Sequence, residues 1–181
     1  MARTVVGSAV VVREKYYWPD AQLNFWWIVM LAAAGTILGV NAQFMTIQNQ
    51  MRLDTPWIMP YGVSVGVVAI IFIIIMMILI SQRRLLPGIM MLFSFILLVL
   101  FITGIIGTAI QLFGGPNINN QCNRFVWNMR QYGPSVNTLA WLQQQNICQC
   151  WQAAFAFYII GTVFLVWMMV IASNVNRNLY G

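Results

Sequence analysis

The chain has 181 residues, of which 61% are hydrophobic and only 7% are charged, and its formal net charge is +6. Soluble domains carry about 25% charged residues, so this composition excludes an ordinary water-soluble domain and requires lipid as part of the solvent. The nine basic residues are scattered and form no basic helix or stripe, which argues against a nucleic-acid partner. We expect their positions to follow membrane topology instead.

Side chains that could support chemistry are scarce. The chain has no histidine, and its three acidic residues, Glu14, Asp20 and Asp54, lie outside the apolar runs. General acid–base catalysis draws mostly on His, Asp and Glu, zinc sites need clustered Cys, His or carboxylate ligands, and proton-coupled transporters place ionisable groups inside the membrane. We therefore expect a non-enzymatic protein with no catalytic residues, no cofactor and no metal.

Four apolar runs are long enough to cross a bilayer. We expect an all-α membrane protein, a four-helix bundle over residues 24–173 with spans at 24–47, 62–80, 88–113 and 151–173. Residues 1–23 form an N-terminal tail in this interpretation, and the cations and aromatic residues of segment 13–20 form an interfacial anchor before the first span. Residues 174–181 form a C-terminal tail.

A tight hairpin between the second and third spans sets the expected orientation. It carries the adjacent Arg83 and Arg84, which favour the cytosolic side of the membrane. Both termini are then cytosolic, and the loops 48–60 and 114–150 lie outside. This arrangement puts six of the nine cations inside and three outside; the inner ones are Arg3, Arg13, Lys15, Arg83, Arg84 and Arg177.

Small residues at four-residue spacing allow helix backbones to approach closely in lipid. The clearest pairs are Gly35 with Gly39 and Gly62 with Gly66. Such faces serve either packing within the bundle or contact with a partner or a second copy, and the sequence leaves both possibilities open. Further small residues expected at packing faces are Gly104, Gly107, Ala153 and Gly161.

Two amides, Asn41 and Gln43, lie deep enough in the first span to require hydrogen-bond partners. They either bond to other helices of the bundle or line a polar path. The aliphatic run from residue 70 to 80 has no polar side chain, and we expect it to face lipid.

The loop 114–150 is predicted to form a small helical hairpin over the outer end of the bundle. One helix covers about residues 123–132, and Gly133-Pro134 ends it. Ser135 is a candidate N-cap for a second helix that ends near Gln145, before the last span.

All three cysteines, Cys122, Cys148 and Cys150, fall in this loop. A disulfide is the default outside the cytosol. Cys148 and Cys150 are too close to favour pairing with each other, so Cys122 is expected to pair with one of them. Closing a loop of about 27 residues is worth about 3.5 kcal/mol in the chain-entropy model. The third cysteine is then free or forms an intermolecular disulfide, because three thiols without a histidine make a poor metal site.

The segment 148–157, Cys-Gln-Cys-Trp-Gln-Ala-Ala-Phe-Ala-Phe, is similar to the Cys…Trp…Ala-Ala…Phe pattern that leads into the last helix in fungal members of the MARVEL-type tetraspan family. The span pattern, with a short first outer loop and a larger second loop with cysteines near its ends, also resembles that family. Plant relatives keep an arginine in the first span and an aspartate in the third, and this chain has neither. The resemblance implies a membrane-organising or trafficking protein, or a companion subunit, without catalytic residues.

These observations predict a non-enzymatic protein of the plasma membrane that packs laterally. It would act as a membrane organiser or as an accessory or scaffold subunit of a larger complex. Its expected partners are membrane lipids and another integral membrane protein or a second copy. The alternative is an oligomeric channel or transporter subunit in which Asn41 and Gln43 line the path.

Overall fold

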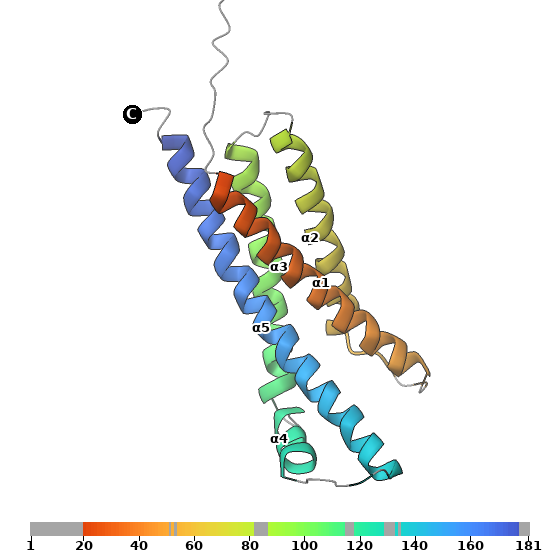
Figure 1. Cartoon of the computed structure of the whole chain (residues 1–181). Coiled ribbons are helices and arrows are strands. Elements are labelled where there is room, and N and C mark those ends of the chain that lie inside the picture. The colour runs from red at the N-terminus through yellow and green to blue at the C-terminus, as the bar shows by residue number, and fades with distance from the viewer. Residues whose placement is uncertain are drawn as a thin grey trace, which may run out of the picture.

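The computed structural model describes residues 20–50, 52, 54–81, 87–114, 118–128, 133 and 135–177. Its four long helices are α1 (Asp20–Gln50), α2 (Ile58–Ser81), α3 (Pro87–Phe113) and α5 (Val136–Arg177), and they run side by side (Figure 1). All four are long and apolar enough to cross a membrane, as expected for a multi-pass membrane protein. The predicted anchor before residue 20 and the hairpin with Arg83 and Arg84 lie outside the described residues.

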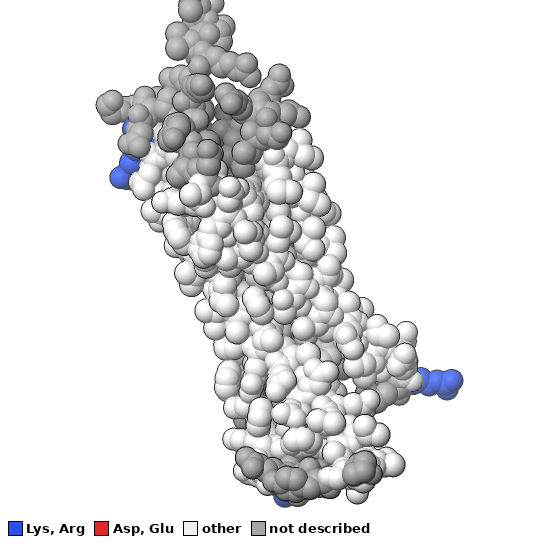
Figure 2. All heavy atoms as spheres, viewed as in Figure 1, with Lys and Arg blue, Asp and Glu red and all other residues white. Residues whose placement is uncertain are grey.

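The helices alternate in direction, so the bundle has two distinct ends (Figure 1). At the end that we call the terminal end, α1 and α3 begin while α2 and α5 finish. The opposite end carries the short helix α4 (Ile118–Cys122) and the π-helix η1 (Asn123–Trp127), and we call it the disulfide end. Basic side chains appear only near the two ends in Figure 2, and the visible surface between them is uncharged. This distribution suits a molecule whose middle lies in lipid.

Helix α5 is longer than a membrane requires. Its 42 residues extend about 63 Å, against a hydrocarbon core of about 30 Å. The ring of Phe113, at the end of α3, lies 6.0 Å from the ring of Phe155, so the part of α5 before Trp151 projects beyond α3. We call Val136–Cys150 the α5 extension.

The uninterrupted α5 corrects the prediction that one short helix ends near Gln145 and a separate helix starts at Trp151. No glycine or proline lies between Gln145 and Trp151, so nothing breaks the helix there. The change from polar to apolar residues marks the edge of the apolar span rather than the end of the helix. Ser135 does cap the start of this helix, since its Oγ accepts a hydrogen bond from the Thr138 amide at 3.3 Å.

Helices α3 and α5 interlock through a reciprocal arrangement of rings and glycines. The ring of Tyr158, from α5, lies directly over Gly104 of α3, and the ring of Phe101, from α3, lies directly over Gly161 of α5. The two rings meet edge to face with their centroids 5.7 Å apart. Close packing of this kind holds helices together in lipid. The hydrophobic effect does not drive helices together there, because lipid tails are as apolar as the side chains.

Hydrogen bonds between helices supplement this packing. The Trp26 indole of α1, which is 2% exposed, donates its Nε1–H to the carbonyl oxygen of Phe164 in α5 at 2.9 Å. The Tyr61 hydroxyl of α2 donates to the carbonyl oxygen of Leu100 in α3 at 2.8 Å. Each bond joins a side chain to the backbone of a different helix, so the two bonds link α1 to α5 and α2 to α3.

The half-buried Tyr61 and the buried Tyr158 should respond differently to loss of the hydroxyl. We expect Tyr61→Phe to lower the free energy of unfolding by about 1 kcal/mol, because it removes the bond to Leu100. Tyr158→Phe should cause no loss, because the buried Tyr158 hydroxyl has no hydrogen-bond partner among the described residues. Denaturation midpoints of the purified variants in one detergent would test this difference. Equal losses in the two variants would contradict it.

Candidate functional site

One face of α1 lies bare on the outside of the bundle. Its exposed residues are spaced so that they share one side of the helix, and we call them the small-residue face: Ala32, Gly35, Gly39, Gln43 and Thr46. A Cβ atom added at Gly35 or Gly39 would meet no other atom within 4 Å. The backbone of α1 is therefore open to a neighbour along this face.

The outward faces of α2 and α3 are different. They present large aliphatic side chains of the kind that lipid tails cover well, including Ile71, Ile74, Ile75 and Ile78 of α2 and Leu92, Ile96, Val99 and Ile106 of α3. The large hydrophobic side chains that α1 exposes are Phe25, Ile28 and Leu31, near the terminal end, and none follows between residues 32 and 50. The small-residue face is thus a distinct surface within an otherwise bulky exterior.

Hydroxyl groups on or beside this face are satisfied by α1 itself. Thr36 donates to the carbonyl oxygen of Ala32 at 2.8 Å, and Thr46 donates to that of Ala42 at 3.0 Å. A second helix could therefore approach the α1 backbone along this face without having to accept hydrogen bonds from these hydroxyl groups. Gln43 presents an exposed amide on the same face.

The two predicted polar residues of α1 do not come together. Asn41 is 6% exposed and donates its Nδ2–H to the Ile37 carbonyl oxygen at 2.7 Å. Its amide fills the space beside Gly62 of α2, where an added Cβ would lie 2.5 Å from the Asn41 Cγ. Gln43, two residues later, is exposed on the other side of the helix. Within one chain, these amides therefore line no common path.

The other predicted glycines contact neighbouring parts of the chain. An added Cβ would lie 2.8 Å from the Leu38 Cβ at Gly66 and 3.0 Å from the Trp57 ring at Gly107. Gly104 and Gly161 receive the rings already described, and Ala153 is half-buried on α5. Among the predicted small-residue pairs, Gly35 with Gly39 is the one that faces outward.

A disulfide joins α4 to α5 and leaves one thiol free. Cys122 pairs with Cys148, the choice that the sequence left open. Cys150 is free and half-buried, with its Sγ 3.5 Å from the Asn146 Oδ1. Residues two apart on a helix point to roughly opposite sides, so Cys150 faces away from Cys122.

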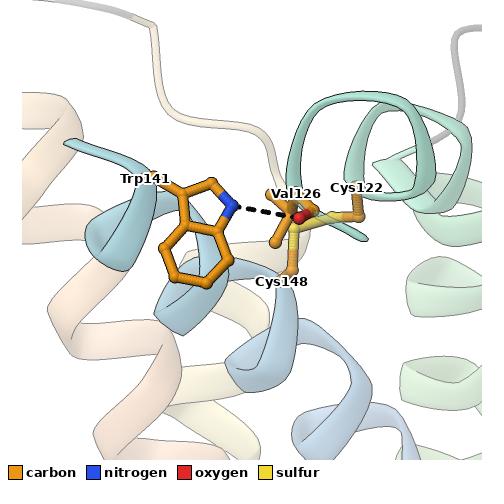
Figure 3. The surroundings of a disulfide bond; sticks show 4 residues. All are labelled: Cys122, Val126, Trp141 and Cys148. Carbon is orange, nitrogen blue, oxygen red and sulfur yellow. Dashed lines mark hydrogen bonds between the residues drawn. A yellow bond between two sulfur atoms is a disulfide. The ribbon is translucent and has the colours of Figure 1, made fainter. Parts of the chain in front are cut away.

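The tryptophan that reinforces this disulfide was not identified from the sequence. Trp141 donates its Nε1–H to the Val126 carbonyl oxygen at 3.0 Å, beside the two cysteines (Figure 3). Val126 is buried in a small cluster with Cys122 and Cys148. The position of Trp141 seven residues before Cys148, on the same side of a helix, is the signal that could have indicated this contact.

The chain matches no protein-family model, no curated protein and no solved structure. Within the described residues, no three His, Cys, Asp or Glu side chains come together as metal ligands could.

Proposed function

We propose that this protein is a non-enzymatic accessory or scaffold subunit, or membrane organiser, that binds a transmembrane helix through the small-residue face of α1. The bound helix belongs to another integral membrane protein or to a second copy of the chain. One observation carries the proposal: Gly35 and Gly39 are bare in the middle of α1, whereas the glycines inside the other spans have neighbours over them, except Gly88 in the first turn of α3. A glycine face in lipid favours helix association because backbones can approach closely.

Packing favours a helix over lipid tails as the occupant of this face. Dispersion energy depends on close contact over many atoms. Flexible tails cover a bulky aliphatic surface such as that of α2 well, but a flat strip of backbone is matched best by another rigid helix. The face runs for several turns of α1, from Ala32 to Thr46, so it suits a helix that crosses α1 within the membrane.

The disulfide end is proposed to lie outside the cell and both termini in the cytosol. A disulfide is stable in an oxidising compartment, and the adjacent Arg83 and Arg84 favour the cytosol. The plasma membrane is the proposed location. The resemblance of the span pattern and of segment 148–157 to MARVEL-type proteins supports the same role, with membrane organisation or companionship to a larger protein as the implied function.

A channel or transporter subunit is the weaker proposal. It required Asn41 and Gln43 to line one polar path. The burial of Asn41 against Gly62, within a single chain, favours a structural role for that amide.

Replacing both Gly35 and Gly39 with leucine should abolish partner binding and leave the fold intact. The added side chains point into open space in the bundle, but they keep a second backbone from approaching. We expect co-purification from mild detergent, quantified by mass spectrometry and light scattering, to fall about tenfold or more. The thermal midpoint of the subunit alone should not change.

The matched control enlarges two exposed residues elsewhere, in the variant Val67→Leu/Val163→Leu. It should co-purify like the wild type. The proposal would be wrong if the wild-type protein were a lone monomer in native membranes, or if the leucine pair at 35 and 39 kept the full amount of partner.

A further inference from the structure

We draw no further inference here: the strongest candidate, the open side of the α5 extension around Leu139 and Leu142, carries exposed Gln143 and Asn146 among its apolar residues, and nothing in the structure shows what covers it.

Discussion

Leucine at Gly161 should lower the free energy of unfolding by about 3 kcal/mol or more, toward the upper end of what overpacking costs. Even an alanine Cβ would overlap the Phe101 ring, and Phe101 is fully buried between α3 and α5. Its ring cannot move aside easily because the Tyr158 ring packs against it and in turn lies over Gly104. A larger side chain at this one position therefore forces the two helices apart.

The matched control is Gly35→Leu, an identical substitution at an α1 glycine with no atoms near its added Cβ. Denaturation of both purified variants in the same detergent would compare them. Gly161→Leu/Phe101→Ala should recover part of the loss, since it removes the ring that the leucine meets. If Gly161→Leu were as stable as Gly35→Leu, the reciprocal packing of α3 and α5 would be incorrect.

Comparison of two glycine pairs shows what the sequence could and could not predict. Gly35-x-x-x-Gly39 and Gly62-x-x-x-Gly66 have the same pattern, yet the first is bare and the second packs against α1. The Gly-x-x-x-Gly pattern indicates only that another helix can approach closely. Which neighbour approaches depends on the rotation of each helix about its axis, and that rotation is set by contacts between segments far apart in the sequence.

The aliphatic run of α2 shows the same limit. We expected residues 70–80 to face lipid, and this prediction is wrong for Phe72, Ile73 and Met76, which are buried. In water, a polar face would identify the exposed side of such a helix. In lipid both sides are apolar, so the run carries no periodic signal and could not reveal its own orientation.

Predictions based on length and hydrophobicity were more successful. Four apolar helices follow from the cost of unpaired backbone groups in hydrocarbon, and the structure has them. The sequence predicted a helix after Ser135, but its continuity with the last span could not be predicted in the same way, because the glutamines and the asparagine of residues 143–149 are compatible with either a helix or a loop. Only the continuity of α5 brings Trp141 to Val126 and turns Cys148, rather than Cys150, toward Cys122.

Removing the disulfide should release α4 and η1 while leaving the bundle folded. Cys122→Ser and Cys148→Ser both remove a cross-link worth about 3.5 kcal/mol in the chain-entropy model. The remaining ties between these elements and the α5 extension include the Trp141 hydrogen bond to Val126 and the small cluster with Ile118. Amide hydrogen exchange in residues 118–127 should accelerate by up to a few hundredfold, and trypsin should cut after Arg124.

The free thiol provides the control for this experiment. Cys150→Ser should keep wild-type exchange in residues 118–127, because Cys150 faces away from Cys122 and is not bonded to it. In Cys148→Ser, residue 150 should not replace the lost partner, since that would require the extension to rotate and pull Trp141 from Val126. Native exchange in Cys148→Ser, or equal acceleration in Cys150→Ser, would show that the bond between Cys122 and Cys148 does not hold this end of the protein together.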